Sequence, residues 1–111
     1  MKTKVMGQYV YWDVCGCVYV GQSDNIMSRI QQHGDRFKHS LLWIFDRTSE
    51  YRSLSYEGVK ALLRWDEAAL IEQYDPEENK MRPKCSADWL QSMPLDAQKV
   101  LMARTPDLTT Q

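Results

Sequence analysis

The sequence lacks the features that define several classes of protein. No run of about 18 or more apolar residues occurs among its 111 residues, so we expect no membrane-spanning helix. The three cysteines are an odd number without a Cys-x2-Cys pair, which argues against a disulfide scaffold or a zinc module. No apolar run precedes a cleavage site near the N-terminus, so we expect no signal peptide and a cytoplasmic, reducing location.

Proline and glycine are also scarce, with four and five residues, and all four prolines lie in the last third of the chain. The sequence has no internal repeat and no Gly/Ser linker. Its length suits one domain with a single modest core. We therefore predict a compact domain over residues 1–85, a helical appendage of the same domain over residues 86–104, and a loose tail over residues 105–111.

The net charge of −1 hides a difference between the two parts of the chain. Residues 1–64 hold nine Lys and Arg against six Asp and Glu, a surplus of three positive charges. Residues 65–111 hold five against nine, a surplus of four negative charges. The N-terminal part is therefore the better candidate for binding a polyanion.

The first elements are predicted to be a β-hairpin and a helix. Residues 5–12 and 17–21 are rich in Val, Tyr and Trp, and between them Asp13 can open a turn and Gly16 can adopt positive φ. A helix is then predicted up to about residue 32. Its expected N-cap is Ser23 or Asp24, and its expected stop signal is Gly34.

The later elements are predicted to be one strand and several helices. The apolar run over residues 41–45 is typical of a buried central strand. Residues 55–74 repeat apolar side chains every three or four positions, which predicts a helix with a break near Trp65 and Asp66. Two short helices are expected on either side of Pro94. The predicted class is α+β, with a small three-stranded antiparallel sheet flanked by helices in the order β-β-α-β-α-α.

Three tyrosines are predicted to project from one face of the hairpin. If the hairpin loop has an odd number of residues, Tyr9, Tyr11, Tyr19 and Gly21 share a face, with Tyr9 opposite Tyr19. The phenols are then candidates for proton transfer. The alternative is that they are ordinary strand-forming residues with hydrated hydroxyls.

Arg29 and His33 are four residues apart on the first predicted helix, so they share one face at the edge of its apolar stripe. A half-buried Arg beside a His suits anion binding and proton transfer. The alternative is a solvated helix boundary.

Glu67 is the one acid that lies inside the apolar stripe of its helix. Its neighbours at −4, +3, +4 and +7 are Leu63, Leu70, Ile71 and Tyr74. An unpaired carboxylate there is costly, so Glu67 should meet a cation, a hydrogen-bond network or a metal. An internal ion pair with Arg29 is the structural alternative. The acids Asp66, Glu72, Glu77 and Glu78 are expected to be solvated.

These candidates together resemble the residues of a one-metal phosphodiesterase. A divalent ion on Glu67 would stabilise the leaving oxygen, and Arg29 would offset charge on the phosphate. Tyr9, Tyr19 or His33 would accept the proton of the attacking water. One carboxylate with water and phosphate ligands suits Mg²⁺, or Mn²⁺, better than zinc.

The order of these motifs resembles the GIY-YIG nuclease family over residues 7–79. Tyr19-Val20-Gly21 is similar to the YIG element, and Arg29 and His33 are similar to the Arg and His of the helix that follows. Residues 67–79 resemble the later motif, with Glu67 as the metal-binding Glu and Asn79 as the closing Asn. The first motif is matched by Gly7-Gln8-Tyr9 or by Tyr9-Val10-Tyr11, so Tyr9 or Tyr11 would fill its role.

The resemblance implies Mg²⁺-dependent hydrolysis of phosphodiester bonds in DNA, one strand at a time. Arg36, Lys38 and His39 would then contact the DNA backbone, and Asn79 would position the site; a solvated charge cluster and an ordinary turn residue are the alternatives. Trp43, Trp65 and Trp89 are expected in the core.

Two functions remain open at this point. The first is an active endonuclease of a phage, a mobile element or a restriction system, working on DNA as a homodimer or with a protein partner. The second is a catalytically silent module of the same fold, whose acidic C-terminal part contacts a protein.

Overall fold

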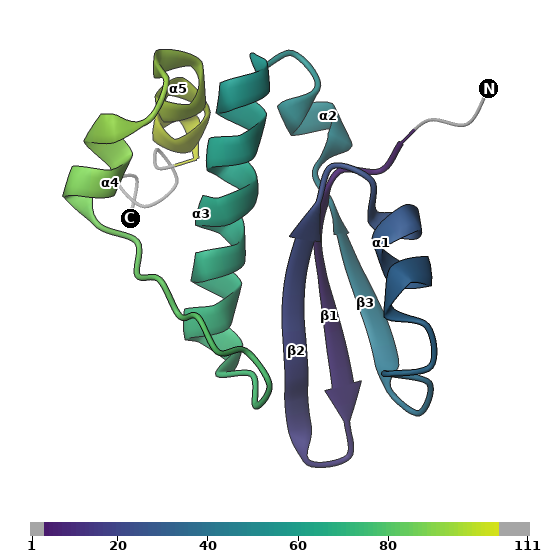
Figure 1. Ribbon diagram of the computed structural model, residues 1–111. Coiled ribbons are helices and arrows are strands. Elements are labelled where there is room, and N and C mark those ends of the chain that lie inside the picture. The colour runs from purple at the N-terminus through teal and green to yellow at the C-terminus, as the bar shows by residue number, and fades with distance from the viewer. Residues whose placement is uncertain (1–3, 105–111) are drawn as a thin grey trace.

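The computed structural model describes residues 4–104 and has an α+β fold (Figure 1). Its three strands are β1 (Gly7–Asp13), β2 (Gly16–Ser23) and β3 (Leu41–Asp46), which form an antiparallel sheet in the order β2-β1-β3. The helices are α1 (Ile26–His33), α2 (Thr48–Tyr51), α3 (Tyr56–Tyr74), α4 (Ala87–Ser92) and α5 (Leu95–Ala103). The tail predicted over residues 105–111 lies outside the described residues.

The β1–β2 hairpin forms where the sequence predicts it. The Oδ1 atom of Asp13 accepts hydrogen bonds from the backbone N–H groups of Cys15, at 2.7 Å, and Gly16, at 3.1 Å. Gly16 has a φ of 135°, a conformation that L-residues rarely adopt. The turn is therefore held by the two residue types that marked it in the sequence.

The pairing register of the hairpin is shifted by two residues from the predicted register. Tyr9 lies opposite Gly21 and Tyr11 lies opposite Tyr19, so the expected pairing of Tyr9 with Tyr19 is wrong. The tight turn pairs Asp13 with Gly16, and a bulge then adds one residue to β2, because Val18 lies between the partners of Trp12 and Tyr11 and has no partner of its own. The sum of paired residue numbers stays even, and the three tyrosines share one face as predicted.

Helix α1 begins one or two residues later than expected. Its N-cap is Asn25, whose Oδ1 accepts from the backbone N–H of Ser28 at 3.3 Å, so the proposed caps Ser23 and Asp24 are wrong. The Ser23 hydroxyl instead accepts from the backbone N–H of Asn25 at 2.9 Å. Gly34 ends the helix with a φ of 58°, as predicted.

Strand β3 is an exposed edge strand, and the prediction of a buried central strand is wrong. The central place belongs to β1, which pairs with β2 on one side and β3 on the other. Trp43 in β3 is 49% exposed, so its expected place in the core is wrong as well. The cause lies in the helices, because the buried clusters under α1 and α3 are built on residues of β1 and β2.

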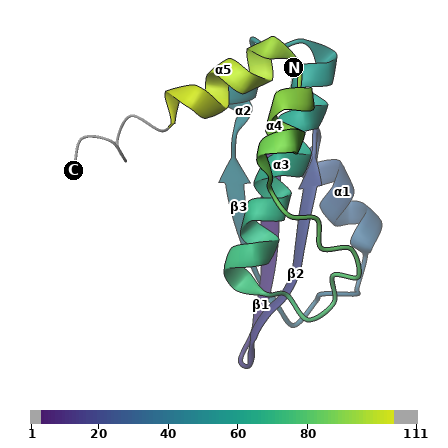
Figure 2. The same ribbon diagram turned by 90° about the vertical axis from the view of Figure 1, so that its left-hand side faces the viewer.

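Helices α1 and α3 lie on opposite faces of the sheet (Figure 1, Figure 2). On one face Tyr9 and Tyr11 pack with Ile26 of α1, and on the other Val10 and Val20 pack with α3. Helix α3 is continuous for 19 residues, so the break expected near Trp65 is absent. Its N-cap, Ser55, is the residue at which the helix was predicted to start.

The C-terminal helices form the outer layer. Helices α4 and α5 are separated by Pro94, as predicted, and pack against α3 on the side away from the sheet (Figure 1). The buried members of this cluster include Leu62, Met93 and Leu101, and Trp65 and Trp89 are partly buried against it. No helix among residues 4–104 is long and apolar enough to cross a bilayer.

Candidate functional site

The tyrosines of the hairpin meet His33 on the α1 face of the sheet. Strand alternation directs Tyr9, Tyr11 and Tyr19 to this face, and His33 in the last turn of α1 lies over them. The ring centroid of His33 is 5.6 Å from those of Tyr9 and Tyr19 and 6.0 Å from that of Tyr11. The structure therefore brings together four aromatic residues that the sequence singled out.

Tyr9 and His33 form the shortest polar contact of this group. The Tyr9 hydroxyl lies 2.7 Å from Nε2 of His33. Burial raises the pKa of Tyr9, and burial together with the charges of Arg29 and Arg36 lowers the pKa of His33. Both groups are therefore neutral at pH 7, and one hydrogen bond joins the Tyr9 hydroxyl to Nε2 of His33.

Gly21 allows Tyr9 to reach this position. A Cβ atom built on Gly21 would overlap the ring carbon of Tyr9 that carries the hydroxyl. No side chain other than hydrogen fits at residue 21 unless the Tyr9 ring moves. Gly21 of the Tyr-Val-Gly element is therefore required for the packing of the Tyr9 ring against β2.

Glu67 is a half-buried carboxylate on α3. Burial raises its pKa to about 7, although the nearby charges of Arg64 and Arg29 act in the opposite direction. Among residues 4–104 it makes no hydrogen bond and no ion pair, so the direct pairing with Arg29 considered from the sequence does not occur. Its negative charge is not neutralised by contact with another side chain.

Glu67 lies where two hollows of the surface meet. One hollow of about 400 Å³ is lined by Glu67 together with Tyr19, Arg36 and Asn79. The second, of about 470 Å³, is lined by Glu67 together with Gln22 and Arg64. Glu67 and Tyr19 therefore line one hollow, although α3 packs on the other face of the sheet from the tyrosines.

A third hollow, of about 440 Å³, continues the surface along α3 and is positively charged. Arg29, Lys60 and Arg64 line it, and Asp24 is its acidic residue. The guanidinium of Arg29 also donates to Gln32 at 3.0 Å, so it stays at the surface beside His33. The hollow can accommodate a polyanion that extends from Glu67.

Of the three residues predicted to contact a DNA backbone, one borders the site and two lie away from it. Arg36 forms an ion pair with Glu78 at 2.9 Å and lies 5.2 Å from the centroid of the Tyr19 ring, so it borders the site. Lys38 and His39 are exposed beyond it, in the segment before β3, and line none of the three hollows.

Asn79 binds the free edge of β2. Its Oδ1 accepts from the backbone N–H of Val20 at 2.8 Å, and its Nδ2 donates to the carbonyl of Val20 at 2.9 Å. The backbone N–H groups of Glu77 and Glu78 donate to Cys17 and Val18. Asn79 thereby fixes the chain after α3 beside Tyr19.

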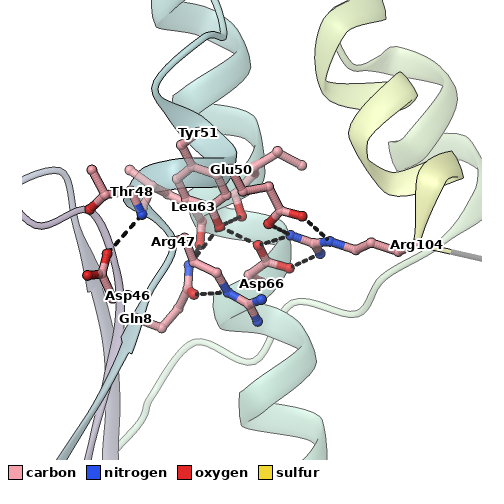
Figure 3. Close-up of polar contacts among 10 residues, drawn as sticks. Gln8, Asp46, Arg47, Thr48, Glu50, Tyr51, Leu63, Asp66 and Arg104 are labelled. Atoms are coloured by element: carbon pink, nitrogen blue, oxygen red, sulfur yellow. Dashed lines mark hydrogen bonds and ion pairs between the residues drawn. The ribbon is translucent and has the colours of Figure 1, made fainter.

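The sequence reasoning missed a second acid, Asp66, which is buried and not solvated as expected. Arg104 donates to Asp66 at 2.6 Å and also pairs with Glu50, and the Tyr51 hydroxyl bonds to Asp66 (Figure 3). The signal was present in the sequence, because Leu62 and Leu70 flank Asp66 at four residues on either side. The network ties α2 and α5 to α3, next to Glu67.

The candidate site offers one carboxylate, that of Glu67, as a ligand for a metal ion. Within residues 4–104 no group of three or more His, Cys, Asp and Glu side chains is placed to bind an ion. A hard cation on Glu67 would therefore complete its coordination shell with water and substrate oxygens, as Mg²⁺ usually does.

Comparison with protein-family models, curated proteins and solved structures gives no match for this chain.

Proposed function

We propose that this chain is a divalent-metal-dependent DNA endonuclease with a site of the GIY-YIG type. The observation that carries the proposal is Glu67, a desolvated carboxylate with no neutralising contact, which lines one hollow together with Tyr19. A structural acid would be expected to have a partner, as Asp66 has in Arg104. The three-stranded antiparallel sheet with helices on both faces is compatible with that fold type.

The chain supports the reaction through its own side chains. Mg²⁺ or Mn²⁺ bound by Glu67 would polarise the scissile phosphate and stabilise the leaving oxygen. Arg29 offsets the charge on the non-bridging oxygens. Tyr19 lines the hollow and, after its hydroxyl has lost its proton to solvent, its phenolate oxygen would accept the proton of the attacking water, since Tyr9 has no exposed surface from which to reach it.

Tyr9 and His33 help to hold Tyr19 in position. The buried Tyr9 holds His33 through its hydroxyl, and the His33 ring in turn lies 5.6 Å from that of Tyr19. Of the two candidates for the first motif, Tyr9 fits better because it contacts both Gly21 and His33, whereas Tyr11 stacks on Phe37 at 4.2 Å. The proposed nuclease domain spans residues 1–85, with residues 86–104 as its helical appendage.

Nicking of supercoiled plasmid tests the proposal. We expect nicking with Mg²⁺ and none with EDTA, and we expect Glu67→Gln and Arg29→Ala to lose at least a hundredfold in rate. Glu72→Gln, an exposed acid on the same helix, and Arg52→Ala, an exposed arginine after α2, are the matched controls. Nicking that survives in Glu67→Gln would overturn the assignment of the metal site.

A catalytically silent binding module is the second candidate, and the surplus of four negative charges after residue 64 favours it. It predicts no nicking under any metal and the same DNA affinity in the wild type and Glu67→Gln. The plasmid assay combined with a binding measurement on the same variants separates the two functions.

A further inference from the structure

Strand β3 has an apolar surface that the rest of the described chain leaves uncovered. Its residues Leu41, Leu42, Trp43 and Ile44 are 71%, 37%, 49% and 43% exposed. Because side chains alternate along a strand, the exposed apolar residues lie on both faces of the sheet. An edge strand of this kind in a soluble fold usually has a partner strand.

The two edges of the sheet are treated differently by the fold. The outer edge of β2 is covered by the segment after α3, where Glu77, Glu78 and Asn79 bond to its backbone. The outer edge of β3 has no pairing strand among the described residues. The backbone groups on that edge are therefore free to pair with another strand.

The hydrogen-bond pattern identifies which groups are free. Arg47 donates to the carbonyl of Met6 at 2.7 Å, so the pair formed by Met6 and Arg47 is hydrogen-bonded in the β1–β3 ladder. Antiparallel ladders alternate, so the odd-numbered residues of β3 bond to β1. The N–H and C=O groups of Leu42 and Ile44 then point outward, at the middle of the exposed strand.

We propose that this edge pairs with β3 of a second copy of the chain, antiparallel about a two-fold axis near Trp43, to form a continuous six-stranded sheet. Leu42 of each copy then exchanges backbone hydrogen bonds with Ile44 of the other. A second copy fits because β3 is itself apolar on both faces, and a two-fold contact requires a self-complementary strand.

Charge complementarity supports a second copy as the occupant. Lys38 is exposed in the segment before β3, whereas Asp46 ends the strand. Hydrogen bonds from Thr48 lower the pKa of Asp46, so its carboxylate is charged at neutral pH. Antiparallel pairing brings Lys38 of each copy toward Asp46 of the other copy. The inference does not depend on the proposed nuclease activity.

Sedimentation velocity over about 1–100 μM tests this pairing. We expect the wild type to sediment as a dimer of about 26 kDa, twice the 13.0 kDa of the chain, and Ile44→Lys to sediment as a monomer with an unchanged far-UV circular dichroism spectrum. Val14→Lys is the matched control, because Val14 is a fully exposed apolar residue at the hairpin tip, and it should remain dimeric.

A second variant tests the same pairing without adding a charge to β3. Ile44→Pro removes an outward N–H without removing a bond to β1, so it should fold and should also be monomeric. A wild type that stays monomeric up to about 100 μM would overturn the proposal. A dimer that persists in Ile44→Lys and Ile44→Pro would show that the copies meet elsewhere.

Discussion

The guanidinium of Arg104 donates to the buried carboxylate of Asp66 at 2.6 Å, across 38 residues of sequence (Figure 3). Burial of Asp66 is tolerated because the Tyr51 hydroxyl also bonds to it and Arg104, which is partly buried, is held in place by a second pair with Glu50. The pairs with Asp66 and Glu50 raise the pKa of Arg104. This contact fixes the end of α5 to the helix that carries Glu67.

We expect Arg104→Ala to destabilise the fold by about 3–5 kcal/mol, because it leaves Asp66 buried without its cation. Urea unfolding measures the change. Arg82→Ala is the control, since its pair with Asp75 is exposed and should contribute less than about 1 kcal/mol. Equal losses in the two variants would contradict the structural role of the network.

Glu67 should make the stability of the fold depend on pH. Its pKa is about 7 in the folded chain and ordinarily 4.5, so the folded state binds more protons between those values. Stability conferred by neutral Glu67 is fully present below pH 4.5 and is lost as pH rises through 7. We expect Glu67→Gln to be more stable than the wild type at pH 8 by roughly 1–2 kcal/mol, a value reduced by solvent screening, and equal to it at pH 4.

The same pair of proteins reports metal binding without any assay of activity. Mg²⁺ at pH 8 should raise the Tm of the wild type and leave that of Glu67→Gln unchanged, because only the wild type has a carboxylate to hold the ion. Thermal unfolding of Glu72→Gln, which should respond to Mg²⁺ as the wild type does, completes the comparison. A Tm shift of the same size in Glu67→Gln would place the ion elsewhere.

Much of the site could be predicted from the sequence because its signals are local. The alternation in β1 and β2 placed Tyr9, Tyr11 and Tyr19 on one face, and the spacing around Glu67 indicated its burial. The register between the strands was not predictable, since it depends on a bulge at Val18 in β2 that has no distinct sequence pattern.

The errors arose where tertiary contacts decide the environment of a residue. Trp43 belongs to an apolar run that predicts burial, but its strand lies at an edge that neither α1 nor α3 covers. Asp66 is buried because Arg104 reaches it from the end of the described chain. The spacing of Leu62 and Leu70 signalled the burial of Asp66, but neither its pairing with Arg104 nor the exposure of Trp43 follows from periodicity, because both depend on which elements lie side by side.

Gly21→Ala tests the close approach of Tyr9 to β2. The added methyl overlaps the Tyr9 ring, so the ring must move away from His33, and we expect a loss of about 1–3 kcal/mol in stability. Urea unfolding in a double-mutant cycle with Tyr9→Leu isolates the overlap. A cost that is unchanged in the Tyr9→Leu background would show that Tyr9 is not the residue that excludes a side chain at 21.

If the chain binds DNA as proposed, the hollow lined by Arg29, Lys60 and Arg64 predicts that the DNA extends from the site along α3. Lys60 is the residue to test, because the charge of Arg64 also acts on Glu67 and its removal would disturb the proposed metal site. If Lys60 contacts a phosphate, Lys60→Gln should weaken binding of every sequence alike and reduce the slope of log K against log salt by about 1.

Fluorescence anisotropy of a labelled duplex in the Glu67→Gln background measures this slope without cleavage. Lys99→Gln, which removes an exposed lysine from α5, is the matched control and should leave the slope unchanged. The Lys60 ammonium lies 5.0 Å from the ring centroid of Tyr56, which is itself exposed, so Tyr56→Ala should further weaken binding of single-stranded DNA by about 1–3 kcal/mol if a base stacks there. An unchanged slope in Lys60→Gln would mean that the DNA follows a different path from Glu67.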